Sequence, residues 1–481
     1  MLFTAKRSKA IFILLVIFIV GLLIRVYFWK NPSTLSWDEG AHSLAGIFVI
    51  QFSLHKFSLP YAYDYLYKYW ATMGSLFFYP WGYSFLTVIS YLIFGVSEFS
   101  ARLPNMFFSI LIIFPTYLLA NEIYGKKVGI LSSFFAAVNP WFIIWGGRAL
   151  ADLPMLSLMS FASYFLIKAA KTRSEKDWAL MGISLGIAGQ MKPIAFLILP
   201  LILLYVFLKD KKLMQSRGFI AGISISIIIL GSYFAFGLFS KYLVYKGEYI
   251  YENVFHWFGL SLVDTGNRVP LPWTSISGWT YYLYLLPAQF GIITLFLAFV
   301  GLAGKIRKHN TEELYLILTV LLVYLAFVLL PNKDPRYTMP FITTMCIFSS
   351  LGAIKISSLT SNSFYKGIIL ALTAALVLVA SLYAILSSSA INYPDAGLNE
   401  VADRLVKEAS GMVAVINETD ELNVQSVSFY LAARDPELKF GVHWSNWLNS
   451  SKYVVSREIL NYIALFNITK QNGTIYLYER R

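Results

Sequence analysis

The chain has 481 residues, of which 57% are hydrophobic and only 14% are charged. Soluble domains carry about 25% charged residues, so this composition indicates an integral membrane protein and excludes an ordinary soluble enzyme. The net charge of +13 comes from short Lys and Arg clusters between apolar segments, a pattern that the positive-inside rule predicts without any nucleic-acid partner.

The first apolar segment, 10–28, follows Lys6, Arg7 and Lys9. No small-residue cleavage site precedes Arg25, so this segment is predicted to be a retained anchor helix and not a signal peptide. A spanning helix needs roughly 20 apolar residues. Further candidate spans are 103–121, 128–146, 152–170, 218–239, 280–301, 313–330, 337–354 and 367–388.

Two stretches need a topological argument. The apolar stretch 178–208 is interrupted at 190–193, and both of its ends meet basic loops, so it is predicted to cross twice as two short helices that meet near Lys192. The segment Tyr83–Glu98 has an apolar core of about 15 residues, short for a span, and is predicted to lie along the outer membrane surface. Every dense basic loop then falls inside. This gives about eleven spans in a multi-pass plasma-membrane protein with a cytoplasmic N-terminus.

The predicted fold is mainly α, with a transmembrane domain over 1–388 that includes a long outer loop, 29–102. The tail, 389–481, is polar enough to form a small extracytoplasmic α/β domain. Within it, 398–409 has the pattern of an amphipathic helix and 412–417 that of a buried strand, and the segments flanking 470–473 read as a hairpin with an Asn-Gly turn. The unblocked N-x-Ser/Thr triplets of the chain are confined to this tail, which supports its outer location: Asn417, Asn449, Asn467 and Asn472.

Ionisable residues collect at the outer ends of the predicted helices, where charge is costly and usually functional. Topology brings four groups to one face: Asp38 with Glu39, Arg148 with Asp152, Lys192 alone, and Lys333 with Asp334 and Arg336. Carboxylates can accept a proton or hold a metal, and cations can stabilise a phosphate leaving group. Together the four groups predict a reaction at an anionic centre.

Several of these residues also have a structural alternative. Asp38 and Glu39 could form the solvated first turn of a surface helix. Arg148 could simply pair with Asp152 one turn later. Lys192 could extend its ammonium group to the lipid headgroups. Convergence of all four groups on one side favours the functional interpretation over each of these.

Two further residues leave alternatives open. Arg336 could be an ordinary anchor at a helix entry. His42 lies four residues after Asp38 and could join Asp38 and Glu39 as a metal ligand, or be a hydrogen-bonded spacer.

The single cysteine, Cys346, excludes disulfides and thiolate metal clusters.

Five short motifs follow one another along the chain: WDEGAH at 37–42, FGVSEFSARLP at 94–104, GGRALADLPML at 146–156, GQMKPIAFLILP at 189–200 and KDPRYTMPFI at 333–342. In this order and spacing, the sequence resembles the GT-C membrane glycosyltransferases. Within these, it is most similar to the group of protein O-mannosyltransferases and of bacterial transferases that put aminoarabinose on lipid A. The resemblance covers residues 10–355 and, more loosely, the tail.

The resemblance implies an inverting enzyme that moves a sugar from a polyprenyl- or dolichyl-phosphate carrier to a protein, glycan or lipid acceptor at the outer face. It implies that Asp38 is the general base and Asp152 the second acidic position, while Glu39 orients the acceptor or holds a metal. The basic positions expected near the donor phosphate are Arg148, Lys192 and Arg336, with Lys333 beside them. The resemblance implies no particular cofactor, and a divalent cation remains an open alternative.

The sequence departs from the family pattern at two places. No basic residue precedes Pro80, where lipid A transferases carry a Lys, although Lys68 or Arg102 could replace that phosphate contact. The tail lacks the W-W-D signature of oligosaccharyltransferases, since HWSNW at 443–447 is only superficially similar. We therefore expect transfer of one sugar and not of a preassembled glycan.

Two other classes of function remain as alternatives. A lipid-linked sugar flippase or transporter would place ionisable residues at mid-membrane depth on broken helices. A catalytically silent scaffold for a glycosylation complex would have Asp38, Asp152 and Arg336 facing away from one another.

Overall fold

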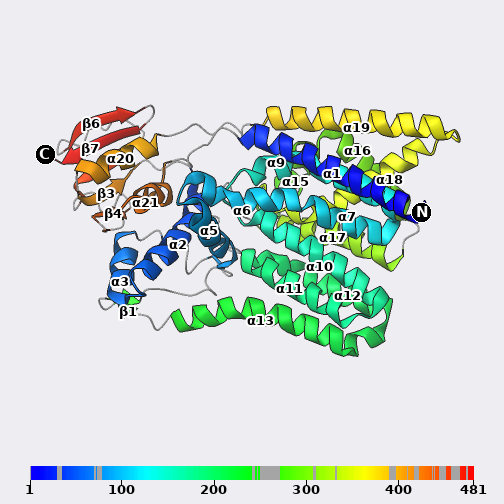
Figure 1. Cartoon of the computed structure of the whole chain (residues 1–481), viewed down its shortest axis with the longest axis horizontal. Coiled ribbons are helices and arrows are strands. Elements are labelled where there is room, and N and C mark those ends of the chain that lie inside the picture. Colours follow the sequence, from blue (N-terminus) through cyan, green and yellow to red (C-terminus); the bar gives the residue numbers. More distant parts are fainter. Residues whose placement is uncertain are drawn as a thin grey trace.

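The computed structural model describes residues 2–29, 35–69, 72, 79–240, 244–245, 248–249, 271–306, 310–330, 333–388, 397–408, 410–416, 422–435, 437, 439–443, 451–456, 466–472 and 475–480. A bundle of long helices occupies one end of the molecule, and a small sheet that includes the C-terminal strands occupies the other (Figure 1). The helices α2 (Trp37–Leu54) and α5 (Gly82–Phe94) lie between them, and α3 (Leu59–Lys68) lies at the same end as the sheet. Residues 30–34, 70–71 and 73–78 of the expected outer loop lie outside the described residues.

The helical bundle follows the predicted apolar segments. Its helices are α1 (Leu2–Trp29), α6 (Glu98–Leu111), α7 (Ile113–Tyr124), α8 (Lys126–Ala137), α9 (Pro140–Gly146), α10 (Asp152–Thr172), α11 (Glu175–Met191), η2 (Pro193–Ile198), α12 (Leu199–Lys209), η3 (Lys211–Gln215), α13 (Arg217–Ser240), α15 (Ile276–Phe290), α16 (Ile292–Ile306), α17 (Thr311–Leu329), η4 (Met339–Phe341), α18 (Ile342–Ser357) and α19 (Ser363–Leu386). A two-residue ladder pairs β1 (Val244–Tyr245) with β2 (Glu248–Tyr249).

Among the described residues, seven helices are long and apolar enough to cross a membrane, or up to nine if each of two bent pairs counts as one span. The chain is therefore a multi-pass membrane protein, but length and composition support fewer spans than the eleven expected. The difference lies in 175–209, where α11 has 17 residues and η2 with α12 forms a helix too short for this criterion. These two helices do meet at Lys192, as predicted.

The candidate span over 280–301 is strongly bent. Helices α15 and α16 meet at an angle of 113°, because Gly291 between them has φ +72, a backbone conformation that residues with a Cβ rarely adopt. A milder bend of 47° separates α8 from α9, where Pro140 opens the second helix. Hydropathy reports the length of an apolar segment but not a break inside it.

Burial separates central from peripheral helices. The buried share reaches 72% in α10 and 78% in Met339–Ser357, but only 11% in α1 and 17% in α19. Helices α13 and α19 lie at opposite sides of the bundle in Figure 1. Asp152 is the first residue of α10, and Arg336 lies just before the buried segment Met339–Ser357, so both residues start from a rigid support.

The segment predicted to lie along the membrane surface forms α5, a helix of 13 residues. Its apolar side chains Phe85, Ile89 and Leu92 are exposed, whereas Tyr83 and Thr87 are buried. A short helix with one apolar exposed face fits an interfacial location better than a span.

The tail contains helices α20 (Leu398–Glu408) and α21 (Val424–Ala432) and strands β3 (Gly411–Val415), β4 (Phe440–His443), β5 (Tyr453–Ser456), β6 (Phe466–Asn472) and β7 (Ile475–Arg480). The strand order is β4-β3-β5-β7-β6, with β3 parallel to β4 and β5 and with β7 antiparallel to β5 and β6. The expected helix, buried strand and C-terminal hairpin are confirmed. Asn467 and Asn472 lie on β6, while Asn417 and Asn449 lie outside the described residues.

Candidate active site

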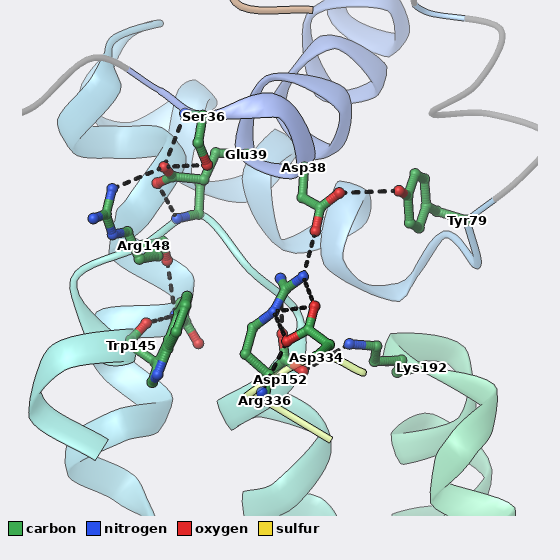
Figure 2. Close-up of polar contacts among 12 residues, drawn as sticks. Ser36, Asp38, Glu39, Tyr79, Trp145, Arg148, Asp152, Lys192, Asp334 and Arg336 are labelled. Carbon is green, nitrogen blue, oxygen red and sulfur yellow. Dashed lines mark hydrogen bonds and ion pairs between the residues drawn. The ribbon is translucent and has the colours of Figure 1, made fainter. Parts of the chain in front are cut away.

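Helix α2 begins directly after Ser36 and carries two carboxylates in its first turn. The carboxylate of Glu39 accepts hydrogen bonds from the backbone N–H and the hydroxyl of Ser36, each at 3.0 Å. This is the S-x-x-E spacing that marks a helix start, and the helix dipole favours acidic side chains there. Because adjacent helical residues point in different directions, Asp38 and Glu39 enter separate surroundings (Figure 2).

Glu39 is completely buried between two arginines. Arg102 Nε donates to its Oε1 at 3.0 Å, Arg148 Nη1 lies 3.4 Å from Oε2, and the N–H of Ala149 donates at 2.8 Å. Burial raises the pKa of this carboxyl, but Arg102, Arg148 and the backbone donors outweigh it and hold the pKa at about 2. Glu39 therefore joins α2, α6 and the loop after α9, and its oxygens are fully engaged by the protein.

Asp38 faces a different cation, Arg336. The Nη2 of Arg336 donates to Asp38 Oδ2 at 2.7 Å, and the hydroxyl of Tyr79 donates to Oδ1 at 3.3 Å. Asp334 holds the other side of the guanidinium, with Nε and Nη2 of Arg336 donating at 3.0 and 2.7 Å. Burial lowers the pKa of Arg336, but the adjacent carboxylates of Asp334, Asp38 and Asp152 raise it well above its ordinary value.

Asp152 and Lys192 complete this cluster from two other elements. Asp152 opens α10 and accepts from Lys192 Nζ at 2.7 Å, while Arg336 Nη1 lies 3.8 Å from its Oδ2. Lys192 ends α11, and its ammonium group also lies 5.7 Å from the ring centre of Tyr337. We call Asp38, Asp152, Lys192, Asp334 and Arg336 the ionic cluster. Figure 2 shows that Lys192 and Arg336 approach the carboxylates from different elements.

Aromatic side chains enclose the ionic cluster. The ring of Trp145 lies 5.6 Å from the guanidinium carbon of Arg336, within the range of a cation–π contact. His42 is buried and contacts the rings of Tyr79 and Tyr83 at 4.6 and 5.3 Å. Burial lowers the pKa of His42 to about 4, against the opposing influence of Asp38.

The structure brings together Asp38, Asp152, Lys192 and Arg336, but not Arg148 or Lys333. Arg148 pairs with Glu39 and not with Asp152, the pairing considered as its structural alternative. Lys333 Nζ donates to the backbone oxygens of Phe327 and Val328 at the end of α17 at 2.9 and 2.6 Å. Burial lowers the pKa of Lys333 to about 8.

Sequence reasoning included Asp334 in the fourth charged group without a role of its own and gave none to Tyr79 or Trp145. It considered Arg102 as a replacement phosphate contact and not as the partner of Glu39. The D-P-R spacing of Asp334 and Arg336 was a visible signal in the sequence. In this short turn the carboxylate of Asp334 also accepts the backbone N–H of Arg336 at 2.8 Å. The contacts of Tyr79 and Trp145 join segments that are distant in the chain, and no local sequence pattern indicates them.

The ionic cluster combines three carboxylates with two cations at one end of the most buried helices. Of its three carboxylates, Asp38 is the most open, with 22% of its side chain exposed against 5% for Asp152 and Asp334. It can accept a proton from a group that approaches from outside, and Lys192 and Arg336 can bind an anion. Within the described ranges, no three His, Cys, Asp or Glu side chains are arranged to hold a metal ion.

Comparisons with known proteins point to one group of membrane proteins. Residues 79–236 match the family model described as dolichyl-phosphate-mannose-protein mannosyltransferase. An uncharacterised protein of Aquifex aeolicus is 24% identical over 54% of this chain and 50% of its own length. An undecaprenyl phosphate-α-4-amino-4-deoxy-L-arabinose arabinosyl transferase of Wigglesworthia glossinidia brevipalpis is 22% identical over 52% of this chain and 44% of its own length. The chain thus spans about half the length of these curated relatives.

Two solved structures share the fold along nearly the whole chain. ArnT from Cupriavidus metallidurans, bound to undecaprenyl phosphate, superposes with a TM-score of 0.68 at 14% identity and covers 99% of this chain and 98% of its own. The oligosaccharyltransferase AglB from Archaeoglobus fulgidus, in complex with an inhibitory peptide and a dolichol-phosphate, gives a TM-score of 0.63 at 14% identity over 94% of this chain and 70% of its own. The chain therefore has the GT-C fold, and its resemblance is to the group of protein mannosyltransferases and aminoarabinose transferases.

Proposed function

We propose that this protein is an inverting glycosyltransferase that moves a single sugar from a polyprenyl- or dolichyl-phosphate carrier to a protein, glycan or lipid acceptor at the outer face of the plasma membrane. The observation that carries the proposal is the meeting of Asp38 with Arg336, 2.7 Å apart, beside the Lys192–Asp152 pair. A transferase with a phosphate leaving group needs a base and fixed cations close together.

In the proposed reaction, Asp38 accepts the proton of the acceptor hydroxyl. The acceptor oxygen then forms a bond to the anomeric carbon, and the bond from that carbon to the phosphate oxygen breaks on the opposite side. The electron pair leaves with the lipid phosphate, whose charge Lys192 and Arg336 stabilise. Asp152 and Asp334 hold these two cations in place, so little reorganisation is needed as charge develops.

Similar proteins support the choice of donor. The ArnT structure contains undecaprenyl phosphate, and the AglB structure contains a dolichol-phosphate. Both folds resemble this chain over more than nine-tenths of its length. The ionic cluster offers the charges that such a lipid phosphate requires.

The test is transfer of labelled sugar from a lipid-phosphate donor in membranes that carry Asp38→Asn. We expect a loss of at least about a hundredfold, since general-base catalysis contributes roughly 10²–10⁴-fold. Asp64→Asn is the matched control, because Asp64 lies on the exposed surface of α3 in the same outer loop. Equal transfer by Asp38→Asn and wild type would exclude the mechanism and favour a flippase or a scaffold.

A direct experiment can identify the class of the acceptor. Deletion of the gene and comparison of the masses of glycoproteins and glycolipids should reveal one missing sugar on one class of molecule. The class that loses mass identifies the acceptor, and the size of the loss distinguishes a hexose from a pentose or an amino sugar.

A further inference from the structure

Helix α21 of the tail is buried along its entire length, from Val424 to Ala432. A helix at the surface of a small domain normally exposes a polar face. Complete burial means that α21 is covered on both sides, by its own sheet and by the first outer loop. Figure 1 shows α21 between the C-terminal strands and α2.

The contact with the outer loop is made at Leu35, two residues before the start of α2. The hydroxyl of Ser426 donates to the carbonyl oxygen of Leu35 at 2.6 Å, and the N–H of Leu35 donates to the hydroxyl of Tyr430 at 3.3 Å. Leu35 is fully buried, so an unpaired backbone group there would be costly. Two side chains of α21 thus satisfy both polar groups of the backbone that leads into α2.

The two helices also approach each other at backbone distance. A Cβ at Gly40 would lie 2.8 Å from the carbonyl carbon of Gln425 and 2.9 Å from its oxygen. Only glycine allows this approach. Gly40 follows Asp38 in the sequence and Leu35 precedes it. Helix α21 therefore contacts the chain on both sides of Asp38.

Tyr430 extends the contact to a second helix. Its hydroxyl donates to the carboxylate of Glu98, which also accepts from the amide of Asn399 at 2.9 Å. Glu98 opens α6, and α6 carries Arg102, the partner of Glu39. The tail therefore holds both helices that fix the orientation of the carboxylate pair.

We propose that Ser426 and Tyr430 are positioning residues that set the place of Asp38 for sugar transfer. The inference rests on the proposed function, in which Asp38 is the base. A misplacement of about 1 Å at a reacting group can cost about a hundredfold in rate, and residues that lock such a group through hydrogen bonds determine its precision. Lys192 and Arg336 are held by Asp152 and Asp334, so donor binding does not depend on these two contacts.

The first experiment compares Ser426→Ala and Tyr430→Phe with Ser428→Ala in the full-length protein. Ser428 is buried in the same helix, and its hydroxyl has no hydrogen-bond partner among the described residues. We expect kcat to fall roughly ten- to a hundredfold for the two test variants, with KM for the lipid-phosphate sugar unchanged, and no change for Ser428→Ala. Equal kcat for all three variants would overturn the proposal, as would a rise in KM without a fall in kcat.

The second experiment adds Ser426→Ala to Asp38→Asn. A residue that acts through Asp38 causes no further loss once that carboxylate is gone, because the two effects are not additive. A general loss of folded protein would instead multiply the two losses and would refute the positioning role.

A third readout does not depend on transfer. Hydrogen–deuterium exchange of the backbone over 35–44 should be faster in Ser426→Ala than in Ser428→Ala, and the rest of the bundle should be unchanged. Unaltered exchange would contradict the contact itself. If Asp38→Asn retained full activity, the proposed function would fail, whereas the exchange result would still decide whether α21 positions α2.

Discussion

At the scale of single residues, Asp38 and Glu39 have different surroundings although they are adjacent in the chain. Asp38 is partly exposed and faces one arginine that is shared with two other carboxylates. Glu39 is buried between two arginines and binds the backbone of Ser36 and Ala149. The geometry therefore suits Asp38 for chemistry and Glu39 for holding three segments of the chain together.

Glu39→Gln should destabilise the fold strongly. The substitution leaves Arg102 and Arg148 buried with their shared carboxylate removed, and breaking a buried ion pair costs roughly 3–5 kcal/mol. A large drop in the thermal unfolding midpoint of the detergent-solubilised protein is the expected result.

Asp38→Asn is the matched control for this prediction. Arg336 keeps its two-point contact with Asp334, so the unfolding midpoint should stay close to that of wild type while transfer is lost. If the two substitutions lowered stability equally, the division of roles between the neighbouring acids would be wrong.

Because the imidazole of His42 is buried, we expect the free energy of unfolding to decrease at mildly acidic pH. Burial lowers its pKa in the folded protein from the ordinary 6.5 to about 4. In this interval the unfolded chain binds the proton and the folded protein does not, so the free energy of unfolding falls as the pH decreases. His42→Gln cannot bind this proton and should show a smaller decrease in unfolding midpoint between about pH 7 and about pH 5. His443, whose pKa burial also lowers to about 4, is present in both proteins and does not account for the difference.

The residues of the ionic cluster could be predicted, because the energetic cost of charge near the membrane and the membrane topology together limit where charged residues occur. Charged residues at the outer ends of apolar segments are few, and the positive-inside rule places them on one face. The partners of each residue were not predictable. Arg148 is one helical turn from Asp152 in the sequence, yet it binds Glu39, because the loop after α9 turns its guanidinium toward α2.

At the scale of elements, the bend between α15 and α16 depends on Gly291. Its φ of +72 strains any residue with a Cβ, at a cost of roughly 1–3 kcal/mol. Gly291→Ala should therefore lower the unfolding midpoint, even though the nearest atoms to an added Cβ are 3.4 Å away and leave room for it.

Gly231→Ala is the control for the bend. Gly231 lies within α13, and nothing lies within 4 Å of an added Cβ there. Alanine is the better helix former by up to about 1 kcal/mol, so this variant should unfold at the same or a slightly higher temperature. A fall of equal size in both variants would mean that backbone conformation does not govern the effect at Gly291.

Predictability at this scale follows the strength of the local pattern. Long apolar segments predicted the helices of the bundle, a short continuous apolar run predicted β3, and an Asn-Gly turn between two strand-like segments predicted the hairpin of β6 and β7. Helix α21 was not predicted, because VQSVSFYLA mixes β-branched, polar and aromatic residues without a helical period. Its cap, in which Asn423 accepts the N–H of Ser426 at 2.9 Å, and its packing on α2 supply what the periodicity lacks.

At the scale of the whole molecule, the proposed orientation puts the sheet domain and α2 outside and the basic loops inside. Figure 1 shows α2 and the sheet at the same end of the helical bundle. The loop between α18 and α19 is exposed at Ser361, and the tail is exposed at Lys452. These two positions should lie on opposite sides of the membrane.

Cysteine labelling can test this orientation directly. The chain has one cysteine, Cys346, which is buried and gives a low background. A membrane-impermeant maleimide should label Lys452→Cys in intact cells and Ser361→Cys only after permeabilisation. The reverse pattern would place the ionic cluster on the cytoplasmic side and would require a cytoplasmic donor.

The contact between Leu35 and Tyr430 has a consequence for biosynthesis. The two residues are 395 positions apart, which corresponds to roughly 20–80 s of translation at about 5–20 residues per second. Helix α2 is made before most of the bundle, but the helix that covers its start follows the whole bundle in the sequence. A nascent chain, or one that ends before α21, has the carboxylates of α2 without that covering surface. Asp38 and Glu39 are therefore translated before most of the groups that surround them.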